Sequence, residues 1–268
     1  MLAEDTLKAM EAFRYIYNLE QVDKGHVGML GFSYGAMLSL ASASHYLINR
    51  DVRYVISFAG PTDMFEMIEY AQTDPRANDF IRTIVSESFM GALMEQIGTM
   101  REKKVPDAMR ALTLYREDFI GKLYMNHPSG QAFLNSFMKT LYSYNEFHDD
   151  LNIAAKILNS HEPEAIKKHI ENLSYYTKSQ FTLLSPKRNI DNIHARVMFL
   201  HGLKDPVIPI EQSESMHTLM KEKGKETEFI IIEGLDHILY PYDLRLLLSY
   251  LYVNGKDALG RVKNFIER

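Results

Sequence analysis

Three residues that lie far apart in the sequence could together carry out nucleophilic catalysis: Ser33, Asp205 and His237. A serine hydroxyl is a poor nucleophile until a base removes its proton, and a histidine oriented by a carboxylate can act as that base. Ser33 is the centre of GFSYG at 31–35, a G-x-S-x-G sequence. This pattern also arises by chance in long chains, so the elements around it decide what it means.

The residues around Ser33 predict a sharp turn from a strand into a helix. The apolar run HVGML at 26–30 precedes the turn and the helical pattern AMLSLASAS at 36–44 follows it, which is the setting of a nucleophile elbow. Ser33 is expected to adopt strained backbone angles, with Gly31 and Gly35 avoiding collisions with the strand and the helix. The helix N-terminus beneath the hydroxyl favours negative charge. The alternative is a glycine- and serine-rich turn without catalysis.

Asp205 and His237 each follow a later apolar run that predicts a buried strand. Asp205 lies in the loop after VMFL at 197–200, and His237 lies shortly after EFIII at 228–232. Parallel strands end at one edge of their sheet, and open α/β sheets place their sites at that edge. We therefore expect all three candidates to lie at the same edge.

The elements that must position these residues alternate between strands and helices. The strand, helix and strand within 26–59 form a βαβ unit, which predicts a parallel sheet. We expect strands at 26–30, 52–59, 196–200 and 228–232, and helices at 2–17, 36–47, 210–223 and 242–253.

Residues 63–185 differ in character from the rest of the chain. They are rich in Met, Phe, Tyr and Leu at helical spacings, and they contain helix breaks near Pro75, Pro106, Pro128 and Pro163. We therefore predict an α/β core made of 1–62 and 186–268, interrupted by a helical cap at 63–185. The apolar residues of the cap could form a substrate-binding wall or only the cap's own core, and the sequence favours neither.

These segments together resemble the α/β-hydrolase superfamily, and within it the prolyl-oligopeptidase-like and dienelactone-hydrolase-like branch. Four segments carry the resemblance: GFSYGA at 31–36, AGPTD at 59–63, SPKRNIDNIHARVMFLHGLKDPVIP at 185–209 and GLDHILYP at 234–241. Ala36 stands where members often have a second glycine, which is a mild departure. The helical segment between the two halves has no counterpart that we recognise.

The resemblance implies an α/β-hydrolase fold, a mostly parallel sheet flanked by helices, and a role for each candidate. Ser33 matches the nucleophile, Asp205 the acid that orients the base and His237 the base, in the chain order of the family. The backbone N–H of Tyr34 is the expected oxyanion donor.

Other candidates for these roles have simpler interpretations. Asp236 is adjacent to His237 and cannot easily face the same imidazole nitrogen. Asp63 is better explained by a structural or rim position, and His201 by a brace of its own loop. The other histidines lack metal-ligand spacing, and the glycines form neither a dinucleotide fingerprint nor a phosphate-binding loop. We expect no metal and no cofactor.

The composition excludes several classes of protein. The 268 residues include 30 basic and 35 acidic side chains, so no basic excess is available for nucleic acid. Without cysteine, neither disulfides nor thiolate sites can form, and no apolar stretch approaches the roughly 18 residues of a membrane span. The first ten residues carry acids where a signal peptide needs cations, so a cytoplasmic location is expected.

The resembled fold normally has several strands before the nucleophile elbow, and few residues precede 26–30 here. The loop that supplies a second oxyanion donor belongs to that missing portion, and the apolar edge of the 26–30 strand lacks a neighbour. We therefore expect the fold to be incomplete at its N-terminal side and the chain to be part of a longer hydrolase. A homo-oligomer or domain swap that covers the edge is the alternative.

The sequence predicts a serine hydrolase that cleaves carboxylic ester or related acyl bonds through an acyl-enzyme. The expected partner is a small-molecule or short-peptide acyl substrate, with no nucleic acid and no membrane span. Two alternatives stay open. One is a serine peptidase acting on short peptides, as the prolyl-oligopeptidase likeness suggests. The other is a non-catalytic, hydrolase-like binding module.

Overall fold

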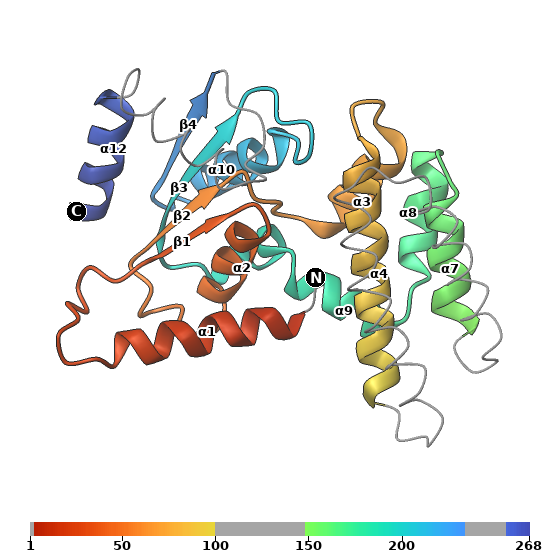
Figure 1. Cartoon of the computed structure of the whole chain (residues 1–268), viewed down its shortest axis with the longest axis horizontal. Coiled ribbons are helices and arrows are strands. Elements are labelled where there is room, and N and C mark those ends of the chain that lie inside the picture. The colour runs from red at the N-terminus through yellow and green to blue at the C-terminus, as the bar shows by residue number, and fades with distance from the viewer. Residues whose placement is uncertain (1–2, 100–147, 234–255) are drawn as a thin grey trace.

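A computed structural model describes residues 3–99, 148–233 and 256–268 (Figure 1). Its centre is a parallel sheet with the strand order β1-β2-β3-β4. The strands are β1 (Met29–Phe32), β2 (Tyr54–Phe58), β3 (Arg196–Gly202) and β4 (Thr227–Ile232). The predicted parallel sheet is therefore confirmed, and the α/β-hydrolase fold class with it.

Two strands differ from their predicted bounds in a way that matters for the site. β1 begins at Met29 instead of residue 26, because His26 closes a turn in which its N–H donates to the Asp23 carbonyl at 3.0 Å. The strand then continues through Phe32, so it ends directly before Ser33. β3 likewise extends to Gly202 instead of ending at residue 200.

Helices cover both faces of the sheet. On one face lie α1 (Ala3–Tyr17), α2 (Tyr34–Ala43) and α10 (Glu211–Glu222), whose buried residues form one cluster with Val197 and Phe199 of β3. Met198 and Leu200 point to the other face, as alternate strand residues do, and pack with α12 (Lys256–Glu267). The sequence prediction missed α12, while the predicted helix at 242–253 lies outside the described residues.

Between β2 and β3 the described residues are helical. They form α3 (Met64–Thr73), α4 (Asp79–Thr99), α7 (His148–Leu158), α8 (Pro163–Glu171), α9 (Tyr175–Leu183) and the 3-10 helix η1 (Pro186–Asn192). Figure 1 shows α3, α4, α7 and α8 standing together beside the sheet. Pro163 is the first residue of α8, a position where its missing N–H costs nothing. The division of the chain into a core and a separate cap unit at 63–185 stays a prediction.

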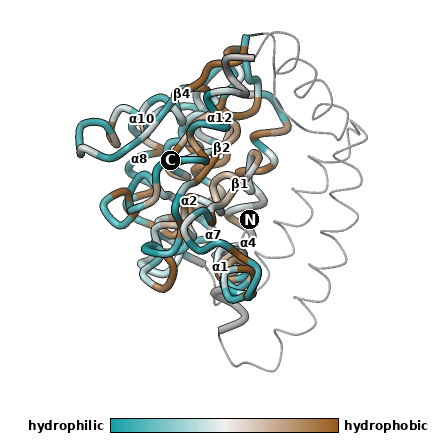
Figure 2. Tube along the Cα trace, turned by 90° about the vertical axis from the view of Figure 1, so that its left-hand side faces the viewer, coloured by the Kyte–Doolittle hydropathy of each residue, from teal (hydrophilic) through white to brown (hydrophobic). Residues whose placement is uncertain are grey.

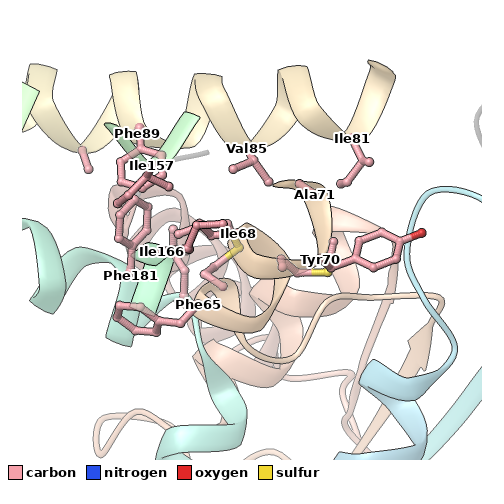
Figure 3. Packing of buried hydrophobic residues seen from close by; sticks show 14 of the residues in the cluster. Phe65, Ile68, Tyr70, Ala71, Ile81, Val85, Phe89, Ile157, Ile166 and Phe181 are labelled. Atoms are coloured by element: carbon pink, nitrogen blue, oxygen red, sulfur yellow. The ribbon is translucent and has the colours of Figure 1, made fainter. Parts of the chain in front are cut away.

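These helices share a core of their own. Phe89 and Phe181 are fully buried with ring centroids 4.9 Å apart and nearly perpendicular planes. Phe65 packs edge-to-face on Phe181. Figure 3 shows the rings of these three phenylalanines at one end of the cluster and the ring of Tyr70 at the other, while Val85 and Ile81 point from α4 toward α3. The described Phe residues of this segment thus serve its core, one of the two roles left open by the sequence.

Hydrogen bonds join the two ends of this helical segment to each other and to α10. Gln212, on α10, accepts from the N–H groups of Thr62 and Asp63 at 2.9 and 3.0 Å. The Ser185 hydroxyl accepts from the N–H of Met64 at 2.9 Å. All five residues are buried, so the contacts are shielded from water. They fix where the helical segment leaves and rejoins the sheet.

Apolar residues are concentrated inside the molecule. In Figure 2 the tube is brown along β2 and teal on outer turns near α10. β1 is the edge strand of the described sheet, and Leu30 on it is 57% exposed. Among the helices of the described residues, none combines the length and apolarity that a membrane crossing requires.

Candidate active site

Ser33 lies between β1 and α2 in a backbone conformation that L-residues rarely adopt. Its φ is 51° and its ψ is −120°. Such a conformation costs on the order of 1–3 kcal/mol and persists only where neighbouring contacts impose it. Here the Ser33 N–H donates to the Phe58 carbonyl at 2.8 Å, and the Ser33 carbonyl accepts from the N–H of Ala36 at 3.0 Å. The strained turn predicted for Ser33 is therefore present.

Two glycines allow the turn to be this tight, but only one of them, Gly31, belongs to the G-x-S-x-G motif. A Cβ on Gly31 would lie 2.1 Å from the Gly35 carbonyl oxygen, so a side chain is excluded there. For Gly35 the prediction was wrong within the described residues, because outside its chain neighbours and the backbone of its own helix none of them has an atom within 4 Å of an added Cβ. Gly60, which the sequence analysis missed, has a steric role instead, because its Cβ would lie 2.5 Å from the Cβ of Ala36.

Alanine substitutions of the two motif glycines are expected to differ sharply. Gly31→Ala should lower the free energy of unfolding by about 3 kcal/mol or more, because backbone atoms of α2 must move. Gly35→Ala should change it by less than about 1 kcal/mol, because alanine favours the helix. Urea unfolding followed by circular dichroism measures both. Equal losses would show that both glycines are sterically required.

Tyr34 is the first residue of α2 and directly follows Ser33. Partial positive charge at a helix N-terminus stabilises a nearby anion, which suits the predicted oxyanion role of the Tyr34 backbone N–H. The Tyr34 hydroxyl donates to a carboxylate oxygen of Asp5 at 2.5 Å, which ties α2 to α1. No local pattern in the sequence indicates this contact, because the two residues are 29 positions apart.

Asp205 lies in the loop after β3, at the sheet edge where β1 also ends (Figure 1). Its Oδ1 accepts from the N–H groups of Val207 and Ile208 at 2.8 and 2.9 Å. Its Oδ2 lies 3.6 Å from His201 Nε2, and both side chains are buried. The carboxylate is thereby fixed in one orientation. The structure thus places Ser33 and Asp205 after parallel strands of one sheet.

His201 braces the loop that carries Asp205. Its Nε2 lies 3.0 Å from the Ile208 carbonyl, which can only accept, so Nε2 carries the proton. The other ring nitrogen, Nδ1, is hydrogen-bonded to the Ser213 hydroxyl at 2.8 Å. The fully buried ring is thus engaged at both nitrogens. This arrangement agrees with the bracing role expected from the sequence.

His237 and Asp236 lie outside the described residues. β4 ends at Ile232 and is parallel to β3, so the chain leaves the sheet at the edge that carries Asp205. The assignment of His237 as the base therefore stays a prediction from the sequence.

Asp63, the other candidate acid, has a structural role. It is the N-cap of α3, where its Oδ1 accepts from the Phe65 N–H at 2.8 Å. Its Oδ2 accepts from Arg188 Nε at 2.8 Å. Burial raises the pKa of the Asp63 carboxyl, and the positive charge of Arg188 opposes that rise. Both oxygens are thus used to join α3 to η1.

Asp63→Asn is expected to destabilise the fold without changing the chemistry. The amide can keep the helix cap but loses the charged bond to Arg188, so the free energy of unfolding should fall by about 1–3 kcal/mol. The matched control is Asp74→Asn, which removes the charge from the more exposed Asp74–Arg76 pair and should cost less than about 1 kcal/mol. Urea unfolding compares the two, and equal losses would contradict the buried role of Asp63.

A cavity opens beside Ser33 and Tyr34. Pro61, after β2, and Ile208, after β3, line it on the side of the sheet. The other lining residues among those described belong to the helical segment, namely Met64, Met67, Ile81, Ile84 and Val85. The helices after β2 therefore contribute directly to the surroundings of the candidate nucleophile, in addition to forming a core.

Two protein-family models match parts of the chain. The family model described as "BAAT / Acyl-CoA thioester hydrolase C terminal" matches residues 10–176, more than half of the chain. The model described as "Prolyl oligopeptidase family" matches residues 151–251. A comparison with curated protein sequences gives no match.

Solved structures of hydrolases are similar to the chain at low identity. They include an acylaminoacyl peptidase from Pyrococcus horikoshii, with 16% identity, a TM-score of 0.45 and coverage of 98% of this chain and 27% of the peptidase. An esterase from Pyrobaculum calidifontis has 14% identity and a TM-score of 0.45, and the match covers 98% of this chain and 59% of the esterase. Acetyl xylan esterase 1 from Thermoanaerobacterium sp. JW/SL YS485 has 14% identity and a TM-score of 0.39, and the match covers 92% of this chain and 51% of the esterase.

The chain thus spans between about a quarter and three fifths of the length of these proteins. The family match over residues 10–176 carries the assignment, and the strained serine between β1 and α2 lies within the matched residues. The chain belongs to the BAAT / acyl-CoA thioester hydrolase C-terminal family and is a prolyl-oligopeptidase-like protein of the α/β-hydrolase class.

Proposed function

We propose that this protein is a serine hydrolase that cleaves carboxylic esters or related acyl bonds through an acyl-enzyme. The observation that carries the proposal is the conformation of Ser33, whose φ of 51° is held by backbone hydrogen bonds to Phe58 and Ala36. A polar residue kept in a strained conformation beside a cavity is typical of a functional site.

In this mechanism the Ser33 oxygen forms a bond to the substrate carbonyl carbon while its proton moves to His237. Negative charge develops on the carbonyl oxygen, and the N–H of Tyr34 at the start of α2 stabilises it. The bond to the leaving group then breaks as His237 returns the proton to it. Water repeats both steps on the acyl-serine and releases the carboxylic acid.

Asp205 orients His237 and stabilises the imidazolium that forms during each transfer. Its rigidity supports this role, because Oδ1 is held by two backbone N–H groups and the loop is braced by His201. A carboxylate fixed in this way costs no reorganisation when the base becomes charged.

A fluorophosphonate probe tests the proposal directly, because it forms a stable bond only with an activated serine. The wild-type chain should be labelled, and mass spectrometry should locate the adduct on Ser33. Ser33→Ala should abolish labelling. The matched control is Ser39→Ala on the same helix, which removes a hydroxyl bonded to the Gly35 carbonyl and should leave labelling intact. A folded wild-type chain that takes no label would contradict the proposal and favour a non-catalytic binding module.

A peptidase acting on short peptides is the second candidate, favoured by the prolyl oligopeptidase match over residues 151–251. Turnover of an aryl ester and a peptide amide with the same acyl group separates the two functions. Hydrolysis of the ester alone would favour the esterase, and efficient amide cleavage would favour the peptidase.

A further inference from the structure

Two loops line the cavity beside Ser33 on the side of the sheet. One follows β2 and contributes Pro61 to the lining, and the other follows β3 and contributes Ile208. The second loop also carries Asp205, the proposed acid, whose Oδ1 accepts from the N–H of Ile208 at 2.9 Å. A displacement of either loop would therefore change the surroundings of the candidate nucleophile.

Both loops are held by neighbouring residues in the first turn of α10. Gln212 Oε1 accepts from the N–H groups of Thr62 and Asp63 at 2.9 and 3.0 Å, and the Gln212 carbonyl accepts from the Thr62 hydroxyl at 2.8 Å. Ser213, the next residue, is hydrogen-bonded through its hydroxyl to His201 Nδ1 at 2.8 Å. All five residues are buried, so these hydrogen bonds are strengthened by the low local dielectric and hold their partners in one arrangement.

Ser213 reaches the acid through His201. The Nε2 of this ring donates to the Ile208 carbonyl at 3.0 Å and lies 3.6 Å from Asp205 Oδ2. Without the Ser213 hydroxyl, the ring would keep its bond within the loop but lose its bond to α10. The ring and the loop would then be free to shift together relative to the sheet. Ser213 is therefore placed to control the position of Asp205.

Gln212 reaches the cavity through the residues that flank its partners. The two N–H groups that it accepts from lie between Pro61 and Met64 in the chain, and both of these residues line the cavity. Its Nε2 donates in addition to Glu66 Oε2 at 3.0 Å, within the first turn of α3. Gln212 is therefore placed to control where α3 begins beside the cavity.

We infer, on the basis of the proposed function, that Gln212 and Ser213 are positioning residues with separate tasks. Ser213 positions the acid, so its loss should slow the chemical step and lower kcat. Gln212 positions the cavity wall at the start of α3, so its loss should weaken the binding of a substrate beside Ser33 and raise KM. A residue that only stabilised the fold would leave both constants of the folded enzyme unchanged, so a split between kcat and KM identifies the two tasks.

The experiment measures kcat and KM of purified variants with an aryl ester, after circular dichroism has shown that each variant is folded. Ser213→Ala should lower kcat by about 10- to 100-fold and change KM by less than about threefold, because a small displacement of the acid costs rate. The matched control is Ser215→Ala on the same helix. It removes a hydroxyl that accepts from Lys187 Nζ at 3.1 Å, and it should keep both constants near those of the wild type.

Gln212→Met keeps the length of the side chain but removes the acceptor for the two N–H groups after β2. KM should rise about tenfold, while kcat changes by less than about threefold. Gln212→Glu together with Glu66→Gln exchanges the amide and the carboxylate, so the bond between the two side chains and the acceptor for the N–H groups are both kept. This double variant should restore KM to within about twofold of the wild type.

Labelling of Ser33 in the wild-type chain by the fluorophosphonate separates failure of this inference from failure of the proposed function. Absence of the adduct would overturn the function itself. With Ser33 labelled, equal effects of Ser213→Ala and Gln212→Met on kcat and on KM would overturn the inference alone. Constants for Ser213→Ala that match those of Ser215→Ala would also overturn it, and so would a double variant whose KM stays as high as that of Gln212→Met.

Discussion

Ser33→Ala and His237→Ala are each expected to lower kcat for an activated ester by about 10⁶-fold. Without the hydroxyl no acyl-enzyme can form, and without the base the hydroxyl keeps its proton. Because the two groups act in one step, the double variant should be no slower than either single variant. Stopped assays with purified, folded protein measure this, using the Ser39→Ala variant as the control for loss of a hydroxyl from α2.

The double variant is the decisive comparison, because it links Ser33 to a histidine that the sequence alone assigns. Two independent contributions would multiply, so the double variant would be slower than either single one. Losses that multiply in this way would contradict a shared proton transfer. A nearly unaffected His237→Ala variant would show that another group acts as the base.

The sequence predicted the sheet and the turn at Ser33 because both depend on local patterns. Apolar runs of strand length gave three strands to within two residues, and the flanking elements identified the turn before any geometry was known. The start of β1 was wrong because His26 is drawn into a turn with Asp23, a local polar contact that competes with an apolar run. The strand type was therefore predictable, and its first residue was not.

Contacts between distant segments explain most of what the sequence did not indicate. Gly60 is required by the approach of Ala36, and Asp63 reaches Arg188 across 125 positions. Neither contact leaves a local pattern, because each depends on how β2, α2 and η1 pack after the chain has folded. Gly35 was given a steric role that it lacks in the described structure. The motif treats its two glycines alike, but of the two only Gly31 has neighbouring atoms that an added Cβ would meet.

In the helical segment, the sequence pattern also could not predict the separate roles of neighbouring apolar residues. Phe89 and Ile84 lie one helical turn and a fraction apart on α4, and spacing alone cannot separate them. In the structure Phe89 is completely buried against Phe181, while Ile84 lines the cavity beside Ser33. The sequence could therefore predict that this segment packs, but not which of its side chains would line a cavity beside Ser33.

Asp205→Asn is expected to lower kcat by about 10⁴-fold at neutral pH while the protein stays folded. The amide oxygen can still accept from the N–H groups of Val207 and Ile208, so the loop keeps its shape. What is lost is the negative charge that selects the tautomer of His237 and stabilises its protonated form. Ester turnover together with circular dichroism distinguishes this loss from unfolding.

Asp63→Asn is the matched control, because it makes the same chemical change in the other buried aspartate considered as the acid. Asp63 is committed to the α3 cap and to Arg188, so its variant should lose stability and keep its turnover per folded molecule. The reverse result, with turnover lost in Asp63→Asn and kept in Asp205→Asn, would exchange the two roles. Because both carboxylates accept two hydrogen bonds or more from the protein, only their kinetic effects can separate the acid that orients a base from the acid that holds a helix.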